Sequence, residues 1–236
     1  KHDYDYPKNA IAFCLKQRNI TGKDLEYVVF FEKPFVKFER LLRTSLQGFP
    51  KTHSLFLQSM RTWLFDKLWV KSLIARSLEI EKTRVLFCEH HLSHAASTYF
   101  CSPFDEAAVV TFDGVGEWAT TTIGVGRGSD LTINKELHFP HSLGLLYSAF
   151  TAFLGFEINE GEYKVMGMAP YGVPSHIDKI RQVVKQNDDG GFWLDPQYFS
   201  FHHDTKRSYT RKFMKLFGTP RNADVPFFTE SSGYAS

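Results

Sequence analysis

Residues 107–137, AAVVTFDGVGEWATTTIGVGRGSDLTINKEL, contain three runs of strand-forming residues that are separated by two glycine-rich turns. The turns are Asp113–Gly116 (DGVG) and Gly126–Ser129 (GRGS), and the runs cover 107–112, 118–125 and 131–137. β-branched residues favour strands, whereas glycine and aspartate favour tight turns. Because connections this short join antiparallel neighbours, the stretch predicts an antiparallel β-meander.

Helices and strands alternate on the N-terminal side of this meander and helices follow it, as in an α/β protein. On the N-terminal side we expect a helix over 8–17, a buried strand over 25–31, two helices over 35–78 joined at Gly48–Pro50, a second buried strand over 84–88, and a helix that ends near residue 100. On the C-terminal side we expect helices over 141–155, 174–185 and 205–217, with the glycine-rich segment 159–172 between the first two. The pattern predicts a mixed sheet with flanking helices.

Composition makes several classes of function unexpected. The chain has 236 residues, of which 43% are hydrophobic, and this is enough for a substantial core. Its 28 basic residues nearly balance its 26 acidic residues, so we expect no broad nucleic-acid surface. No uncharged apolar run is long enough for a membrane span. The three cysteines form neither an even disulfide set nor a CxxC pair, which suits a reducing, cytoplasmic location.

The segment Glu89–Ser97, EHHLSHAAS, places three histidines at the predicted junction between a strand and a helix. On a helix, His90 and His94 lie one turn apart on the same face, whereas His91 points elsewhere. Two imidazoles at this spacing form half of a site for a divalent metal. A histidine pair that only forms hydrogen bonds with backbone or water at the helix start is the alternative.

Asp113 offers a third ligand, because it directly follows the first strand of the meander and is held at the strand end. Two histidines and one carboxylate suit Fe(II), and also Zn or Mn, and they leave coordination positions open for water or substrate. As an alternative, the carboxylate accepts hydrogen bonds from the N–H groups of its own turn.

Two glycine-containing segments offer groups that bind phosphate. In the first turn of the meander, Gly114 and Gly116 would let backbone N–H groups point outward, although DGxG is also a common plain turn. Gly161, Glu162 and Lys164 combine a flexible backbone, a carboxylate that can bind ribose hydroxyls and an ammonium that can bind phosphate. The alternative for this second segment is a solvated loop.

The histidines of FHHD (201–204) have no partner that the sequence identifies, and we expect them in a surface loop. The chain also lacks the Gx4GK[ST], GxGxxG, GxSxG and HExxH signatures. The P-loop, dinucleotide-binding, hydrolase and zinc-protease interpretations therefore lack their key residues.

Four motifs in one order and at close spacing resemble a known family. They are EHHLSHAAS (89–97), FDEAAVVTFDGVGEWATTTIGVG (104–126), FPHSLGLLYSAFTAFLGF (139–156) and NEGEYKVMGMAPYG (159–172). Together they resemble the O-carbamoyltransferases of the NodU and cephalosporin-carbamoyltransferase type. The resemblance is strong over 89–172 and weaker over 1–31.

The resemblance implies an actin-like, ribonuclease H-like ATPase fold related to the tRNA-threonylcarbamoyl-transfer protein. It implies that an adenylating domain makes carbamoyl-adenylate from carbamoyl phosphate and ATP, and that the actin-like domain passes the carbamoyl group to an acceptor hydroxyl of a secondary metabolite or saccharide. It further implies that His90, His94 and Asp113 are metal ligands. The residues of the two glycine-containing segments would then lie near the adenylate.

The resemblance also implies a division of the chain. Residues 1–217 would form part of the actin-like domain, with 1–105 as the end of its first subdomain plus a helical insertion, 106–217 as the start of its second subdomain, and 218–236 as an irregular tail. We expect both ends to be cut from a longer protein, with a proton-transfer residue upstream of Lys1 and the adenylating C-terminal domain absent. We therefore predict that the isolated chain does not turn over carbamoyl phosphate.

Two other interpretations remain open. In an actin-like kinase or ATPase, the DGVG turn would hold the γ-phosphate and Mg²⁺ would replace the transition metal, although Mg²⁺ prefers oxygen ligands to imidazole nitrogen. In a non-catalytic truncated domain, exposed apolar faces would cause self-association, and a homodimer is one form of this. No motif specifies the acceptor beyond a small molecule with a hydroxyl group.

Overall fold

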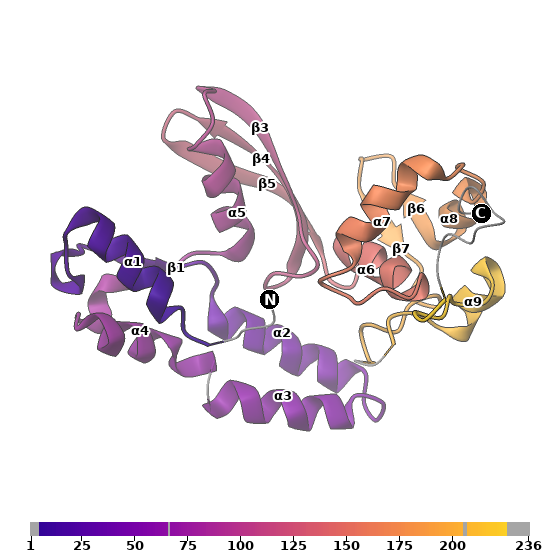
Figure 1. Ribbon diagram of the computed structural model, residues 1–236, viewed down its shortest axis with the longest axis horizontal. Coiled ribbons are helices and arrows are strands. Elements are labelled where there is room, and N and C mark those ends of the chain that lie inside the picture. Colours follow the sequence, from indigo (N-terminus) through magenta and orange to yellow (C-terminus); the bar gives the residue numbers. More distant parts are fainter. Residues whose placement is uncertain (1–4, 66, 205–206, 226–236) are drawn as a thin grey trace.

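The computed structural model of the protein describes residues 5–65, 67–204 and 207–225 (Figure 1). The helices are α1 (Lys8–Arg18), α2 (Pro34–Gln47), α3 (His53–Phe65), α4 (Val70–Leu78), α5 (His90–Tyr99), α6 (Leu143–Phe153), α7 (Glu162–Met168), α8 (Ile177–Val183) and α9 (Arg211–Phe217). The strands are β1 (Val28–Phe30), β2 (Val85–Phe87), β3 (Glu106–Phe112), β4 (Ala119–Arg127), β5 (Asp130–His138), β6 (Val184–Gln186) and β7 (Phe192–Leu194). Helices and strands alternate, so the α/β prediction is confirmed.

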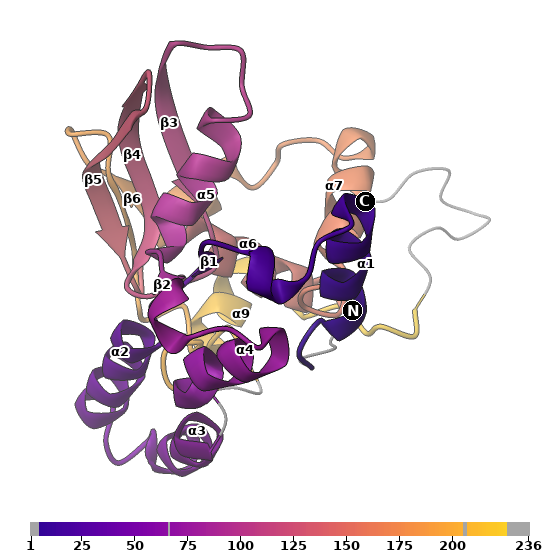
Figure 2. The ribbon, with the colours of Figure 1, turned by 90° about the vertical axis from the view of Figure 1, so that its left-hand side faces the viewer.

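The predicted meander forms as expected from β3, β4 and β5. All of its pairing is antiparallel, with Phe112 opposite Thr121 in the first pair and Arg127 opposite Asp130 in the second. Helix α5 lies along one face of this sheet in both views (Figures 1 and 2). Ala95 and Tyr99 of α5 pack with Val109 of β3 in a buried cluster, and this packing fixes the helix that carries the histidines.

Strands β1 and β2 form a parallel pair, with Val28 opposite Val85. Helices α1 and α4 supply most of the apolar side chains that pack around the buried Val85. The two strands were predicted to be buried, and this is wrong for the face that points away from α1 and α4. On that face Val29 is 61% exposed and Leu86 is 44% exposed. Side chains alternate between the faces of a strand, and no layer of the described residues covers this second face.

The expectation of one mixed sheet is also wrong for the described residues. Their strands form three separate sheets, with the orders β1–β2, β3–β4–β5 and β6–β7. The chain passes from β2 into α5, which packs on the meander, before it enters β3, and no hydrogen-bonded ladder joins the parallel pair to the meander in the described part of the chain.

The segment 35–78 contains three helices instead of the two that were predicted. The break at Gly48–Pro50 is confirmed and includes a cis bond between Phe49 and Pro50. A second interruption follows α3, where the 3₁₀ turn Lys67–Trp69 separates α3 from α4. This turn contains Trp69, whose side chain is 61% exposed.

The C-terminal part packs α6, α8 and α9 with the β6–β7 hairpin (Figure 1). Its core is rich in aromatic residues, including Phe153, Phe199 and Phe213. The helix predicted over 174–185 is shorter than expected, because Val184 leaves α8 and pairs with Leu194 in the hairpin. Residues 218–225 contain no helix or strand, and the remainder of the expected tail lies outside the described residues.

Within the described ranges, no helix combines the length and the apolar character that crossing a bilayer requires.

Candidate metal centre

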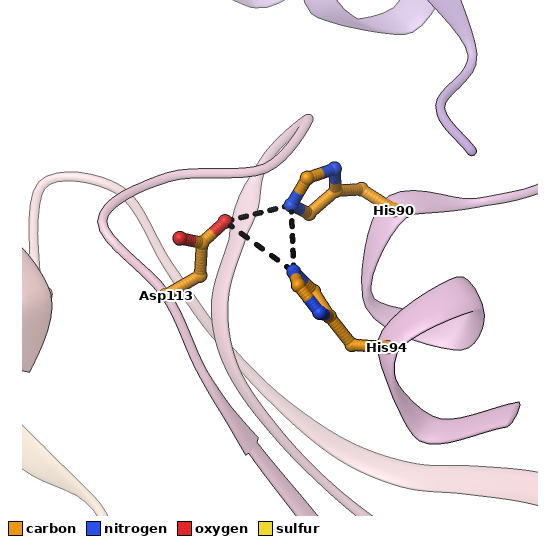
Figure 3. Close-up of side chains that lie close together, drawn as sticks. All are labelled: His90, His94 and Asp113. Carbon is orange, nitrogen blue, oxygen red and sulfur yellow. Dashed lines mark hydrogen bonds and ion pairs between the residues drawn. The ribbon is translucent and has the colours of Figure 1, made fainter. Parts of the chain in front are cut away.

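The predicted ligands come from one helix and one turn that face each other (Figure 3). His90 is the first residue of α5, and His94 lies one turn further along the same helix. Asp113 directly follows β3, and its N–H donates to the carbonyl of Thr120 in β4 at 2.9 Å. Strand pairing therefore fixes the backbone of Asp113, and helix packing against the meander fixes the two histidines.

Three ligand atoms converge in this arrangement. Oδ2 of Asp113 lies 2.7 Å from Nε2 of His90 and 3.9 Å from Nε2 of His94, and the two Nε2 atoms lie 3.1 Å apart (Figure 3). Metal–ligand bonds of about 2.0–2.2 Å place neighbouring ligand atoms roughly 3 Å apart. Two of the three edges are close to that spacing and the third, at 3.9 Å, is longer. The structure brings the three predicted residues together and their donor set fits a divalent metal, whereas metal binding stays a prediction.

The electrostatics of the centre favour an ionised carboxylate. The hydrogen bond from His90, helped by the N–H of Gly114, lowers the pKa of Asp113 to about 2 although burial acts in the opposite direction. The carboxylate is therefore an anion at neutral pH. The side chain of His94 is 50% exposed, whereas that of His90 is 14% exposed, so a ligand can approach from the His94 side.

His91 has the structural role that its position off the shared face predicts. Its Nδ1 lies 2.6 Å from the hydroxyl of Thr111, and its Nε2 lies 2.8 Å from the carbonyl of Ala119. The ring is buried, and burial lowers its pKa, so the imidazole is kept neutral. It connects α5 to β3 and β4 and points away from the three ligand atoms.

Glu117 is the important residue that the sequence interpretation missed. Its buried carboxylate accepts a hydrogen bond from the N–H of Lys33 at 2.5 Å and another from the N–H of His90. Lys33 caps α2 and His90 begins α5, so one carboxylate holds the N-termini of two helices, where a negative charge is favourable. Burial raises the pKa of Glu117. An acidic residue inside the DGVGEW motif was the available signal.

Helix α6 fixes the other side of the DGVG turn. The hydroxyl of Ser142 accepts from the N–H of Leu145 at 3.0 Å and lies 3.0 Å from the carbonyl oxygen of Asp113 and 2.6 Å from that of Gly114. A Cβ on Gly144 would lie 2.7 Å from the backbone of Asp113. The start of α6 therefore packs directly on the turn, and only glycine permits this approach.

The outward-pointing N–H groups expected at Gly114 and Gly116 are not observed. The N–H of Gly114 donates to Oδ1 of Asp113 at 2.7 Å, and the N–H of Gly116 donates to the carbonyl of Ala119 at 3.1 Å. Gly116 has a steric role instead, because a Cβ there would lie 2.8 Å from Cδ2 of His90. The alternative in which Asp113 accepts from its own turn is present together with the histidine contacts.

The second glycine-containing segment is partly a helix rather than a loop. Glu162 is the first residue of α7, and its Oε1 accepts from the hydroxyl of Ser148 at 3.0 Å and from the N–H of Asn159 at 2.9 Å. Its carboxylate therefore joins α6 to α7. Gly161 is buried, and the exposed Lys164 has its ammonium 5.8 Å from the ring centroid of Phe156. Nucleotide contacts by these residues remain predictions.

The expectation of a surface loop for His202 and His203 is only half right. The residues lie in a turn, but both side chains are half-buried and line a cavity. No sequence pattern indicates this cavity, because several of its other walls come from distant parts of the chain.

Comparison with known proteins adds independent information. Residues 1–227 match the protein family described as Carbamoyltransferase N-terminus. The chain is 48% identical over 231 residues to an uncharacterized protein of Synechocystis sp., a match that covers 94% of this chain and 37% of the relative. It is 32% identical over 198 residues to nodulation protein NolNO of Sinorhizobium fredii, covering 81% of this chain and 27% of that protein.

A third relative is nodulation protein NolO of Bradyrhizobium diazoefficiens. The chain is 38% identical to it over 106 residues, which cover 44% of this chain and 19% of that protein. The chain therefore spans less than two-fifths of the length of each of these relatives.

Proposed function

The chain belongs to the carbamoyltransferase family, whose N-terminal part it matches over 1–227, and from this membership we propose that it is the metal-holding part of an O-carbamoyltransferase. The reaction moves a carbamoyl group, H₂N–C(=O)–, from an activated donor to an acceptor hydroxyl. The observation that carries the proposal is the convergence of His90 Nε2, His94 Nε2 and Asp113 Oδ2 on one point.

The donor set supports the choice of metal in this proposal. Two imidazole nitrogens and one carboxylate oxygen suit Fe(II), with Zn and Mn as alternatives, and leave other coordination positions open. A divalent metal held by these three residues would supply positive charge that stabilises the transfer of the carbamoyl group. Asp113 keeps its negative charge at neutral pH, because its pKa is about 2, and so it favours a cation here.

The surrounding residues hold these ligands in place before any substrate binds. Glu117 accepts the N–H of His90, and Ser142 lies within hydrogen-bonding distance of the carbonyls of Asp113 and Gly114. Positioning of reacting groups reduces the entropy that must be lost in the transition state. The half-exposed His94 marks the side from which donor and acceptor enter.

The donor in this proposal is carbamoyl-adenylate, made from carbamoyl phosphate and ATP, and the acceptor is a small molecule with a hydroxyl group. Gly161, Glu162 and Lys164 are the proposed contacts to the adenylate, and the exposed Lys164 ammonium is the cation among them. The residue that removes the acceptor proton is not assigned to this chain.

The kinase or ATPase alternative has less support from the site. It needs free N–H groups in the DGVG turn, but those of Gly114 and Gly116 are engaged by Asp113 and Ala119. It also needs oxygen ligands for Mg²⁺, and two of the three converging ligand atoms are imidazole nitrogens.

Metal analysis of the purified protein tests the proposal. We expect the wild type to contain close to one equivalent of a divalent metal, and the variants His90→Ala, His94→Ala and Asp113→Asn to lose most of it. His138→Ala is the matched control, because His138 also pairs with a carboxylate, Glu136, but at an exposed position in β5. Equal metal content in all five proteins would contradict the proposal.

Transfer activity is the second measurement. The longest native polypeptide that contains this chain is incubated with a hydroxylated acceptor, ATP and carbamoyl phosphate. Mass spectrometry should then show a carbamoylated product. The three ligand variants should abolish this product, and His138→Ala should retain it. Full transfer by Asp113→Asn would mean that the centre is not part of the reaction.

A further inference from the structure

A cavity of about 680 Å³ lies apart from the three ligand atoms. Its walls come from the end of α2 and the loop that follows it, from Trp118 just before β4, from Phe139 just after β5, and from the segment 196–203. Segments far apart in the sequence therefore build one space. Its volume lies in the range of sites for small organic ligands, about 300–1,000 Å³.

Flat aromatic side chains form part of the lining. Phe49, Trp118, Phe139 and Phe199 all contribute. Aromatic faces stack on the rings of sugars, bases and other planar or ring-shaped groups, and such walls are common in cofactor and ligand sites. The apolar part of the cavity thus suits a ring.

The polar part of the cavity carries one ammonium and two imidazoles. Lys51, His202 and His203 line it, and no aspartate or glutamate is found among the described lining residues. Nδ1 of His202 is buried and has no hydrogen-bond partner within the described ranges. Burial lowers the pKa of His202, and the neighbouring His203 and Lys51 lower it further. The neutral form of His202 is thus favoured, and its unsatisfied buried nitrogen lies in the same cavity lining as the Lys51 ammonium.

A buried arginine lies behind this lining, and the carboxylate of Glu32 offsets part of its charge. Arg40 of α2 is only 6% exposed, and its guanidinium carbon lies 5.3 Å from the ring centroid of Phe139. Its Nε has no hydrogen-bond partner among the described residues, and burial lowers its pKa to about 10, which still leaves it charged at neutral pH. The cation lies against one of the aromatic walls of the cavity.

We propose that this cavity binds a small phosphorylated ring compound, with the phosphate at Lys51, His202 and His203 and the ring between the aromatic side chains. A phosphate supplies negative charge for the ammonium and several acceptor oxygens for the N–H groups of the ammonium and the imidazoles. The ring is that of a sugar phosphate or of a nucleotide. This site does not depend on the metal centre or on the transfer reaction.

Isothermal titration calorimetry tests the proposal on the His94→Ala variant, which removes the exposed metal ligand and so avoids phosphate binding to a metal. Glucose 6-phosphate, AMP and inorganic phosphate are titrated separately. We expect one of the two ring compounds to bind at least roughly tenfold more tightly than inorganic phosphate, because only the ring uses the aromatic walls. The tighter of the two identifies the source as a sugar phosphate or a nucleotide.

Substitutions then locate the site. Lys51→Gln and His202→Gln should each weaken the better ligand by about tenfold, since each removes one charged or donating partner of the phosphate. Lys23→Gln is the matched control, because Lys23 is an exposed lysine that pairs with Glu79 on the surface. Lys51 is itself exposed, so its variant keeps the test valid if His202→Gln fails to fold.

Three results would overturn the proposal: no binding of either ring compound at millimolar concentration, equal affinity for inorganic phosphate, or unchanged affinity in Lys51→Gln. The metal content of the wild type and of the ligand variants is measured separately. Failure of this proposal therefore leaves the metal centre intact, and failure of the metal centre leaves this one testable.

Discussion

At the scale of single residues, Asp113 shows how one side chain serves the fold and the site together. Its Oδ1 accepts the N–H of Gly114 and so shapes the turn, while its Oδ2 faces His90 and His94. The two alternatives that the sequence left open, a turn residue and a metal ligand, are therefore compatible. A carboxylate has two oxygens, and each of them makes one of these two kinds of contact.

Glu117 is not one of the proposed metal ligands, but its substitution should weaken metal binding. We predict that Glu117→Ala lowers metal affinity by about 10- to 100-fold, the range for residues that orient metal ligands, because the N–H of His90 loses its acceptor. The free energy of unfolding should fall by roughly 1–3 kcal/mol, the cost of leaving buried N–H groups unpaired. Chelator competition and urea denaturation measure the two effects.

Glu117→Gln tests whether the hydrogen bond to His90 is what maintains metal affinity. An amide oxygen still accepts one N–H, so this variant should recover part of the lost metal affinity. Glu136→Gln, at an exposed carboxylate that pairs with His138, should change neither quantity. Wild-type metal affinity in Glu117→Ala would show that the contact to His90 does not position the ligand.

His141 should make stability depend on pH. Its Nδ1 accepts the N–H of Leu194 at 3.2 Å, and burial lowers its pKa below the ordinary value. The folded protein thus favours the neutral ring, and the unfolded chain binds the proton more readily. The contribution of His141 to the free energy of unfolding is fully present above the pKa of the unfolded chain, about 6.5. It is lost as the pH falls through and below that value.

The comparison of wild type with His141→Gln measures this effect, because other buried histidines contribute equally to both proteins. The wild type should lose more unfolding free energy than the variant between pH 7.5 and about 5, as followed by urea denaturation at each pH. Parallel pH profiles would rule out the contribution of His141.

At the scale of elements, the two glycines of the DGVG turn should behave differently. A Cβ on Gly116 would lie 2.8 Å from Cδ2 of His90, whereas a Cβ on Gly114 would meet nothing nearer than Leu145 at 3.9 Å. We predict that Gly116→Ala costs about 1–3 kcal/mol of stability through overpacking, and that it also weakens metal binding by displacing the ring.

Gly114→Ala is the matched control for this pair and should remain within about 0.5 kcal/mol of the wild type, because the space for the new methyl group is open. Urea denaturation and metal titration of both variants check the prediction. Equal effects of the two substitutions would mean that the contact between the turn and α5 is not as close as the structure indicates.

The elements that the sequence predicted well are those with strong local signals. The meander has two glycine-rich turns at the right spacing, and α5 and α6 begin close to where the motifs indicated. The β6–β7 hairpin was missed because Val184–Gln186 and Phe192–Leu194 are too short to show a period. Helix α7 was missed because two glycines in 161–167 resemble a loop, and the contacts of Glu162 stabilise it as a helix.

At the scale of the whole molecule, an exposed apolar face on the parallel pair is the most unusual feature. Val29 of β1 and Leu86 of β2 lie opposite each other in register and are both exposed, with Phe31 next to them along the chain. Parallel sheets are normally covered on both faces. An uncovered face of this kind favours association with another apolar surface.

We therefore predict that the 236-residue chain self-associates, and that the double substitution Val29→Ser, Leu86→Ser reduces this association. Sedimentation velocity over a range of protein concentrations should show a rising average mass for the wild type and a constant monomer mass for the variant. The matched control is Val110→Ser, at an exposed apolar position on the outer face of the meander. A wild-type chain that stays monomeric throughout would contradict the prediction.

The sequence by itself determined the α/β class, the antiparallel meander, the shared helix face of His90 and His94 and the place of Asp113 at a strand end. These features depend on residues that are close along the chain, and local patterns specify them. Only the tertiary structure decided that Asp113 contacts His90, 23 residues earlier in the chain, that Glu117 holds two helix N-termini, and that Lys51, Trp118 and His202 share one cavity. Such contacts result from how helices and sheets pack against one another, and the spacing of residues in a sequence does not encode that packing directly.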